Sequence, residues 1–282
     1  MAAIIDGKAI SAAIREEIKA EVCEYVKEHG RAPSLTVIIV GEDPASQIYV
    51  RNKQRACEQA GIISDVIRLP EQTDEDELLG IISALNDNKD VNGILVQLPL
   101  PSHIDEKKVI CAISPKKDVD AFGYENLGRI LSGDYDFLPC TPAGVMELLR
   151  RSGISVSGKN CVVLGRSNIV GKPMAALLMH ANGTVTVCHS RTADVASHTK
   201  EADIIVAAVG KAGFLTADMI KDGAVIVDVG INRTPDGKLT GDVDFEGCFE
   251  KAAAITPVPG GVGPMTITML LKNTLTAAKK QN

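Results

Sequence analysis

The chain has 282 residues, of which 45% are hydrophobic and 23% are charged, and its formal net charge at pH 7 is −6. This composition is ordinary for a globular protein, and the length is long for one core, so we expect two domains. The negative charge without a basic tract argues against nucleic-acid binding, and no apolar run approaches the ~20 residues that a membrane-spanning helix needs.

Strand-like apolar runs alternate with helical patterns along most of the chain. In the first half, strands are predicted at Leu35–Val40, Ile63–Leu69 and Gly93–Leu98, and helices at Lys8–His29, Pro44–Ala60 and Asp74–Asn86. In the second half, strands are predicted at Asn160–Leu164, Thr184–Cys188, Asp203–Val209 and Ala224–Val229, and helices at Thr141–Ser152, Ile169–Asn182 and Thr216–Lys221. Continuous β-branched runs separated by helices are typical of parallel sheets buried on both faces. The sequence therefore predicts an α/β protein built from βαβ units.

The alternation is interrupted at residues 133–136, and Thr141-Pro142 then opens a new helix. We therefore expect a domain boundary near residues 134–140, with residues 1–138 in the first domain and residues 139–264 in the second. A last helix is predicted at about Met265–Lys280. Residues 265–282 are expected to return and complete the first domain.

Seven cysteines are scattered along the chain without a Cys-x-x-Cys pair. Neither a metal site nor a thioredoxin-like motif is therefore predicted. Such a set indicates reduced thiols in a cytoplasmic protein, and the N-terminus has no signal-peptide apolar region.

Lys53 is the one charged residue in an apolar sector of the helix predicted at Pro44–Ala60. Asp43 suits the N-cap of this helix and Gly61 suits its stop. At about 100° per residue, Lys53 shares a face with Tyr49. A lysine that points into a low-dielectric surface loses hydration, which disfavours its charged form and suits proton transfer. Taken alone, the pattern favours a lysine whose stem packs while its ammonium reaches water, but the motifs below favour catalysis.

A strand, a glycine turn and a helix start follow one another at residues 161–173, in the order typical of a dinucleotide site. Gly165 allows the tight turn, and Gly171 allows the helix to approach the strand closely. The helix start is expected to offer unpaired N–H groups to a pyrophosphate. Ser167 stands where the usual second glycine would be, so the motif is imperfect.

The strand predicted at Thr184–Cys188 ends without the acid that usually holds the ribose 2′-hydroxyl of NAD. Arg191 lies there, and Arg166 and the Ser190 hydroxyl are close to it in the expected turn. Arginine binds phosphate as a fork, so this set suits a 2′-phosphate and favours NADP over NAD. The alternative is that one or both arginines are solvated surface residues.

Gln97 is a single amide near the carboxyl end of a predicted strand, where ligands bind in open α/β sheets. It can exchange hydrogen bonds with a lysine or with a ligand heterocycle. Asp118 and Asp120 follow, and a carboxylate suits the N–H/NH₂ edge of an aminopyrimidine ring. Each residue by itself also has an ordinary structural explanation, as a strand-end amide or an aspartate of a capped loop.

Taken together, these motifs resemble the bifunctional methylenetetrahydrofolate dehydrogenase/cyclohydrolase family, the FolD type, over essentially the whole chain. The motifs are Tyr49-Val50-x-x-Lys53, Val96-Gln97-Leu98-Pro99-Leu100-Pro101, Lys117-Asp118-Val119-Asp120, Pro139-Cys140-Thr141-Pro142, residues 165–173, residues 228–232 and residues 257–266. One departure is Ala121, where the family usually has glycine. A methyl group there could tilt the loop that carries Asp120.

The resemblance implies two reactions in one-carbon metabolism. The first is NADP-dependent oxidation of 5,10-methylenetetrahydrofolate to 5,10-methenyltetrahydrofolate, and the second is hydrolysis of that product to 10-formyltetrahydrofolate. By the same resemblance, Lys53 is the base or proton carrier of the hydrolysis and Gln97 orients and tunes it. Tyr49 stacks on the folate ring, and Asp120 holds the pterin edge.

The resemblance also implies that the first domain binds folate and that the second is a Rossmann-like NADP-binding domain, with a cleft between them. Pro259, Gly260 and Gly261 are expected to bind the substrate and Ile231 the cofactor, although a glycine run by itself is more often only a turn. The expected partners are tetrahydrofolate one-carbon derivatives, with no nucleic acid and no membrane. A cytoplasmic homodimer is expected.

Three alternative functions share some of these features. Short-chain dehydrogenases also use a Tyr-x-x-x-Lys pair, but their nucleotide glycines come first, whereas Tyr49 precedes Gly165 here. A non-catalytic NADP- or folate-binding protein is opposed by the intact set of Tyr49, Lys53, Gln97 and Asp120. A monofunctional dehydrogenase without cyclohydrolase activity stays open, because the sequence discriminates it poorly.

Overall fold

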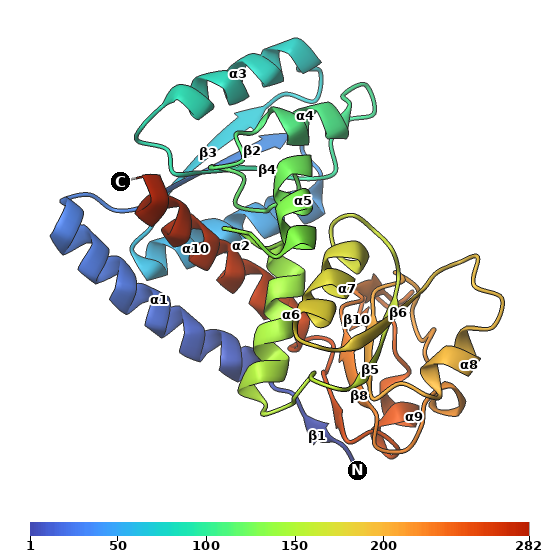
Figure 1. Ribbon diagram of the computed structural model, residues 1–282. Helices are drawn as coiled ribbons and strands as arrows, with labels where there is room; N and C mark the ends of the chain where they lie inside the picture. The colour runs from blue at the N-terminus through green and yellow to red at the C-terminus, as the bar shows by residue number, and fades with distance from the viewer. Residues whose placement is uncertain (282) are drawn as a thin grey trace. The chain divides into compact units, whose positions relative to one another are not determined.

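The computed structural model describes residues 1–281, and the predicted α/β architecture with parallel sheets is confirmed within them (Figure 1). The chain divides into two compact units, one of residues 1–12 and 139–266 and one of residues 13–138 and 267–281. Asn282, the last residue of the predicted C-terminal segment, lies outside the described residues. Each unit is organised around its own sheet of parallel strands.

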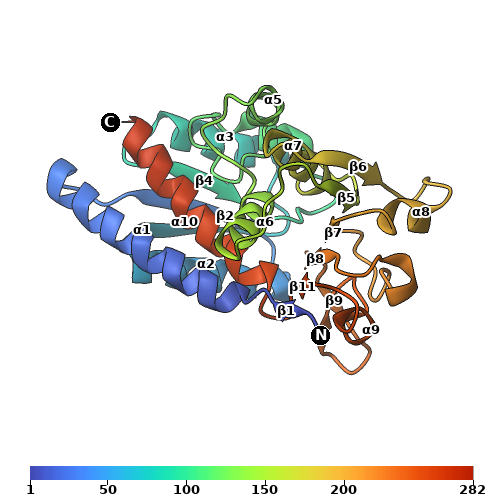
Figure 2. The same cartoon turned by 60° about the horizontal axis from the view of Figure 1, so that its bottom comes forward.

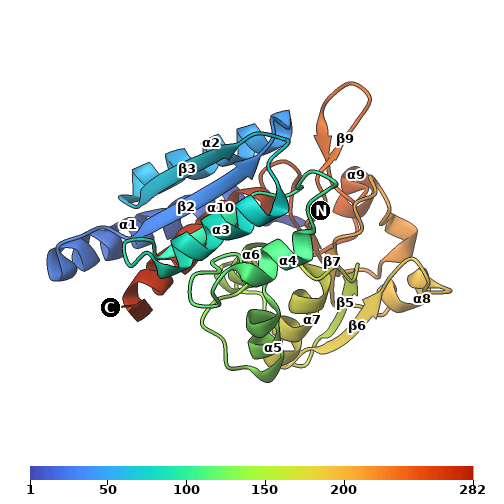
Figure 3. The ribbon, with the colours of Figure 1, turned by 90° about the horizontal axis from the view of Figure 1, so that it is seen from above.

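The unit of residues 13–138 contains a three-stranded parallel sheet in the order β3-β2-β4 among its described residues. The strands are β2 (Ser34–Val40), β3 (Ile63–Leu69) and β4 (Gly93–Val96), and the connecting helices are α2 (Pro44–Ala60) and α3 (Glu75–Asp87). All seven residues of β2 are buried. Figure 3 shows α2 and α3 on opposite faces of this sheet. Because both faces are covered, the central strand is a continuous apolar run, as the sequence predicted.

Two short helices of this unit were not predicted, namely α4 (Glu106–Ala112) and α5 (Tyr124–Ser132). The long helices α1 (Gly7–His29) and α10 (Val262–Gln281) lie side by side in Figures 1 and 2. Arg15 Nε donates to Thr268 Oγ1 at 2.9 Å, and the Tyr25 hydroxyl donates to the carbonyl of Ala278 at 3.4 Å. Both pairs are 253 positions apart, so the two helices run parallel and in register.

The unit of residues 1–12 and 139–266 contains a parallel sheet in the order β1-β11-β8-β7-β5-β6 within its described part. The strands are β1 (Ala3–Ile4), β5 (Asn160–Leu164), β6 (Thr184–Cys188), β7 (Ile204–Ala207), β8 (Val225–Asp228) and β11 (Ala254–Ile255). Residues 1–12 were expected in the first domain, but their contacts group them with this unit, because β1 pairs with β11. Ala3 N donates to Ala253 O at 2.8 Å and Ile5 N donates to Ile255 O at 2.9 Å.

The connections of this sheet are α6 (Cys140–Arg151), α7 (Gly171–His180), α8 (Val195–Thr199), α9 (Phe245–Phe249) and the antiparallel pair β9 (Asn232–Arg233) and β10 (Leu239–Thr240). The helix predicted at Thr216–Lys221 is instead a single 3₁₀ turn, η1 (Ala217–Met219). The Thr216 hydroxyl donates to the Asp218 carboxylate at 2.5 Å, a local bond that competes with a continued helix.

All seven cysteines are free thiols. In the part of the chain that the structure describes, no helix has the combination of length and apolar character that crossing a bilayer demands.

Two glycines inside helices have opposite surroundings. A Cβ atom added at Gly144 in α6 would lie 2.7 Å from the Cβ atom of Met265, which is closer than real Cβ contacts. A Cβ atom added at Gly80 in α3 would meet no heavy atom within 4 Å.

We expect Gly144→Ala to lower the free energy of unfolding by about 1–3 kcal/mol, because α6 must move away from Met265. Gly80→Ala should raise it by about 0.5–1 kcal/mol, because alanine loses less backbone entropy in a helix. Denaturant titration followed by circular dichroism measures both variants. A Gly144→Ala variant at least as stable as the wild type would contradict the packing described for Gly144.

Candidate active site and nucleotide pocket

Helix α2 has the ends that the sequence predicted. The Asp43 carboxylate accepts a hydrogen bond from Ser46 N at 2.7 Å, and Gly61 ends the helix with φ of 78°. Val50 and Cys57 are fully buried on one side of α2. These contacts fix the position and rotation of the helix that carries Tyr49 and Lys53.

The structure brings Lys53 and Gln97 together. The Lys53 ammonium donates to Gln97 Oε1 at 3.1 Å, and Gln97 follows directly after β4. The Gln97 amide nitrogen donates to the carbonyl of Leu98 at 2.7 Å, which fixes the amide so that its oxygen is directed at the lysine. Tyr49 lies one helical turn before Lys53 and its side chain is 44% exposed, so its ring is accessible for stacking.

Cys57 lies one turn after Lys53 on α2. Burial raises the pKa of the Cys57 thiol to about 12, so this group is neutral at physiological pH. It therefore adds no negative charge beside Lys53, and the hydrogen bond from the lysine goes to the neutral amide of Gln97.

The motif of residues 117–120 contains buried structural groups as well as a candidate ligand group. The Lys117 ammonium donates to the carbonyls of Leu85 at 2.8 Å and Asn88 at 2.6 Å, near the end of α3. Burial lowers the pKa of this lysine. Lys117 therefore anchors the loop to α3 and is not available to a ligand.

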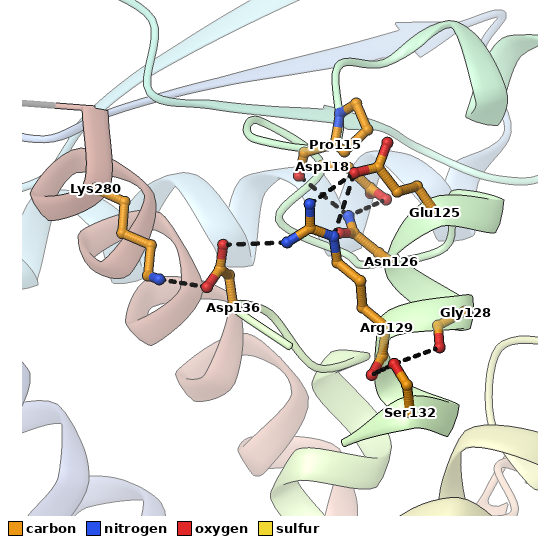
Figure 4. A network of polar contacts seen from close by, with 9 residues as sticks. All are labelled: Pro115, Asp118, Glu125, Asn126, Gly128, Arg129, Ser132, Asp136 and Lys280. Carbon is orange, nitrogen blue, oxygen red and sulfur yellow. Dashed lines mark hydrogen bonds and ion pairs between the residues drawn. The ribbon is translucent and has the colours of Figure 1, made fainter. Parts of the chain in front are cut away.

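Asp118 is also structural. Its carboxylate accepts from Gly123 N at 2.8 Å and from the Asn126 side chain at 3.0 Å (Figure 4), and it is 2% exposed. Burial raises the pKa of the Asp118 carboxyl. Asp120 is only half-buried, so among the two predicted aspartates it is the one that a ligand can reach. Ala121, which directly follows Asp120, has a positive φ of 56°.

Helix α5, which carries Asn126, has one ion pair within itself and one to the segment that follows it (Figure 4). Arg129 pairs with Glu125 at 2.9 Å and with Asp136 at 3.9 Å, and Asp136 also pairs with Lys280 of α10. These side chains are largely exposed, so each pair contributes little by itself. The buried hydrogen bond from Asn126 to Asp118 is the contact that joins α5 to the loop before it.

The glycine turn after β5 is tightly packed. Gly165 has φ of +118°, and a Cβ atom there would lie 2.2 Å from the carbonyl oxygen of Ala208 after β7. A Cβ atom at Gly171 would lie 2.3 Å from the carbonyl oxygen of Gly165. Glycine is therefore required at both positions, where α7 crosses the end of β5.

The start of α7 differs from the expectation. Ser167 Oγ accepts from Val170 N at 3.2 Å and from Gly171 N at 3.4 Å, and Ser167 O accepts from Lys172 N at 3.0 Å. The prediction that this helix start offers unpaired N–H groups is therefore wrong for these three residues. The Ser167 hydroxyl, at the position of the usual second glycine, accepts from two of them, and the backbone carbonyl of Ser167 accepts from the third.

A cavity of about 590 Å³ lies at the carboxyl ends of β5, β6 and β7. Its lining comprises residues 164–167, 188–190, 192, 195, 208, 209, 211 and 214. Gly165, Arg166, Ser167 and Ser190 belong to this lining, as expected from a nucleotide site, whereas Arg191 and Ile231 do not and are both exposed.

Lys211 also lines the cavity and was not singled out from the sequence. Its ammonium lies 5.8 Å from the centre of the Phe214 ring, which lines the same cavity. Lys211 follows the end of a predicted strand by two positions, and that placement at the ligand-binding edge of the sheet is the signal that could have found it.

The glycines of residues 260–261 pack against the start of α1. Gly260 has φ of +112° and its carbonyl accepts from Lys8 N at 3.0 Å. A Cβ atom at Gly7 would lie 1.8 Å from the carbonyl oxygen of Gly261. The backbone that approaches these glycines closely is thus the start of α1. The neighbouring Pro259 is exposed.

Models of two domains match the chain. The catalytic domain of tetrahydrofolate dehydrogenase/cyclohydrolase matches residues 5–120, and the NAD(P)-binding domain of the same family matches residues 139–282. A protein of Magnetococcus marinus described as Bifunctional protein FolD is 60% identical over 280 residues, which cover 99% of this chain and 98% of that protein.

Solved structures agree along the whole length. The bifunctional FolD methylenetetrahydrofolate dehydrogenase/cyclohydrolase of Campylobacter jejuni has a TM-score of 0.97 and 49% identity, with 100% of both chains covered. The methylenetetrahydrofolate dehydrogenase-cyclohydrolase (FolD) of Trypanosoma brucei, complexed with NADP cofactor and inhibitor, has a TM-score of 0.94 and 42% identity, with 99% of this chain and 98% of that chain covered. The chain therefore belongs to the tetrahydrofolate dehydrogenase/cyclohydrolase family.

Proposed function

We propose that the chain is a bifunctional folate enzyme. It oxidises 5,10-methylenetetrahydrofolate to the 5,10-methenyl form with NADP⁺ and hydrolyses that product to 10-formyltetrahydrofolate. The observation that carries the proposal is the hydrogen bond from the Lys53 ammonium to Gln97 at the carboxyl end of β4. Family membership supports it, since the relative from Magnetococcus marinus is described as bifunctional.

Hydrolysis needs a group that moves protons, because water must lose a proton as it adds to the methenyl carbon. Lys53 is that group, and Gln97 holds its nitrogen in one place. The exposed ring of Tyr49 stacks on the folate and shields the reacting carbon from bulk water. The half-buried Asp120 binds the aminopyrimidine edge of the pterin with two parallel hydrogen bonds, and Pro259, Gly260 and Gly261 complete the contacts to folate.

The cavity beside β5, β6 and β7 fits the adenosine part of NADP⁺ in chemistry as well as in size. Arg166 and the Ser190 hydroxyl bind the 2′-phosphate, with Arg191 at the same strand end. Gly165, Ser167 and Gly171 shape the turn, and Ile231 contacts the cofactor elsewhere. When bound, NADP⁺ accepts a hydride from the one-carbon bridge. The lone pair of the neighbouring folate nitrogen expels that hydride, so no side chain has to remove a hydroxyl proton.

The chain is further proposed to act as a cytoplasmic homodimer. In the sheet of residues 1–12 and 139–266, β6 is an edge strand among the described residues, and Val187 on it is 36% exposed. An open edge of this kind pairs readily with a second copy. The reduced state of all seven cysteines agrees with the proposed compartment.

Lys53→Met should reduce hydrolysis of methenyltetrahydrofolate by at least about 100-fold, because the proton carrier is lost. The decay of methenyl absorbance measures this rate. Arg55→Met, at an exposed position of α2, is the matched control and should keep normal activity. Unchanged hydrolysis in Lys53→Met would remove Lys53 from its proposed role.

Arg166→Ala should raise the KM for NADP⁺ by about tenfold or more and leave the KM for NAD⁺ unchanged, because a charge-assisted bond to the 2′-phosphate disappears. Arg191→Ala should also raise the KM for NADP⁺ and not that for NAD⁺, but by a smaller factor, because Arg191 does not line the cavity. Initial rates of methenyl formation with each cofactor test both variants. An equal loss with NADP⁺ and NAD⁺ would refute the 2′-phosphate assignment.

Asp120→Ala should raise the KM for methylenetetrahydrofolate by about tenfold or more, because two charge-assisted hydrogen bonds to the pterin are lost. The KM for NADP⁺ should stay the same. Asp134→Ala, at an exposed position of the same unit, is the control. If the folate KM does not change in Asp120→Ala, the pterin is held by another group.

A further inference from the structure

A single buried carboxylate organises the loop after β7. Asp242 Oδ2 accepts from Val209 N at 2.6 Å and from Gly210 N at 2.9 Å. Its other oxygen accepts from Lys211 N at 2.9 Å and from the Asn232 side chain at 2.9 Å. Asp242 is 0% exposed. Three consecutive backbone N–H groups and one amide therefore converge on one side chain that does not line the nucleotide cavity.

The loop held in this way forms part of the cavity wall. Ala208, Val209 and Lys211 line the cavity, and Gly210 between them has φ of +69°. This left-handed backbone turns the N–H groups of the loop toward Asp242. Without the carboxylate, buried N–H groups would lose their acceptors, which is a costly arrangement that a loop avoids by changing its conformation.

A second buried carboxylate fixes Asp242 in turn. Asp228, at the end of β8, accepts from Asp242 N at 3.0 Å, Gly230 N at 2.9 Å and Val243 N at 3.0 Å. A Cβ atom at Gly230 would lie 2.2 Å from Asp242 Oδ1. Burial, aided by the neighbouring Asp242 charge, raises the pKa of Asp228 to about 6. Two carboxylates are thus buried close together, and between them they bind the loops that follow β7 and β8.

We propose that Asp242 is a positioning residue of the nucleotide site, which shapes the loop of residues 208–211 so that its side chains form the wall against which NADP⁺ binds. Asp242 acts through this loop and does not touch the cofactor. The inference rests on the proposed NADP⁺-dependent function. It predicts that changes at Asp242 affect nucleotide binding and leave the folate hydrolysis step intact, because hydrolysis uses no nucleotide.

The test is Asp242→Asn in the full-length chain. Each carboxylate oxygen accepts two of the four hydrogen bonds, so the NH₂ group of an asparagine would face two donors in either orientation. We expect the Kd for NADPH, measured by isothermal titration calorimetry, to rise by about tenfold or more. Methenyl hydrolysis in the same preparation should be unchanged, which reports that the protein is folded.

Asp203→Asn is the matched control, because Asp203 lies at the opposite end of β7. Its carboxylate accepts from Asn160 N at 2.8 Å and from the Lys221 ammonium at 2.6 Å. It thus also holds one backbone N–H of the same sheet and one side chain from the segment before β8, but away from the cavity. Asp203→Asn should bind NADPH as the wild type does, even if its thermal stability falls.

Gly210→Ala is a second variant that changes the loop and spares the carboxylate. A Cβ atom there meets no heavy atom within 4 Å, so its effect comes from the positive φ alone. We expect the same selective weakening of NADPH binding. If Asp242→Asn does not fold, Gly210→Ala decides the question, and normal NADPH binding in it overturns the inference.

Three results would overturn the positioning role. These are wild-type NADPH affinity in Asp242→Asn, an equal loss in Asp203→Asn, and a parallel loss of methenyl hydrolysis, which indicates general damage to the fold. A wild-type chain that binds no NADPH would overturn the proposed cofactor itself together with this inference. That case is distinguishable because it appears before any variant is made.

Discussion

The hydrogen bond from Lys53 to Gln97 is the interaction on which the proposed chemistry depends. It joins α2 to the end of β4 across 44 positions of sequence. The two residues therefore meet only when the parallel sheet that carries β4 has formed. The acceptor is a neutral amide whose orientation is fixed by the Leu98 carbonyl. A carboxylate at this position would stabilise the charged ammonium and hinder the release of its proton. An amide locates the lysine without adding a negative charge beside it, which suits the role of proton carrier proposed for Lys53.

The sequence predicts the larger part of the fold because the signals for its long elements are strong and local. Strand-like apolar runs locate β3, β5 and β6 with their observed ends, and the capping residues locate both ends of α2. The strands β1 and β11 are too short, at two residues each, to leave a periodic signal. Their pairing joins residues 251 positions apart, as in Ala3 with Ala254, so it is not visible in the local sequence. The assignment of residues 1–12 therefore had to come from the structure.

The candidate site is predictable in its location and less so in its individual side chains. Gly165 and Gly171 are identifiable because only glycine fits where backbones touch. The sequence places both Arg191 and Lys211 just after predicted strands. It does not show that, of these two residues, Lys211 lines the cavity and Arg191 does not. It likewise does not separate Asp118, which binds its own loop, from Asp120. An aspartate that binds backbone N–H groups and an aspartate that binds a ligand are the same residue in the sequence. Only their hydrogen-bond partners in the structure distinguish them.

The alanine at position 121 shows how such a structural acid constrains its neighbours. Ala121 N donates to the backbone carbonyl of Asp118 at 3.0 Å, while the side chain of Asp118 binds Gly123 N on the other side. Ala121, which lies between these two bonds, has a positive φ of 56°. A left-handed conformation costs an alanine roughly 1–2 kcal/mol that a glycine is spared. The methyl group is fully buried, which offsets part of this cost. At position 121 the alanine therefore acts on the stability of the loop in two opposing ways, through the strain of its backbone and through the burial of its methyl group.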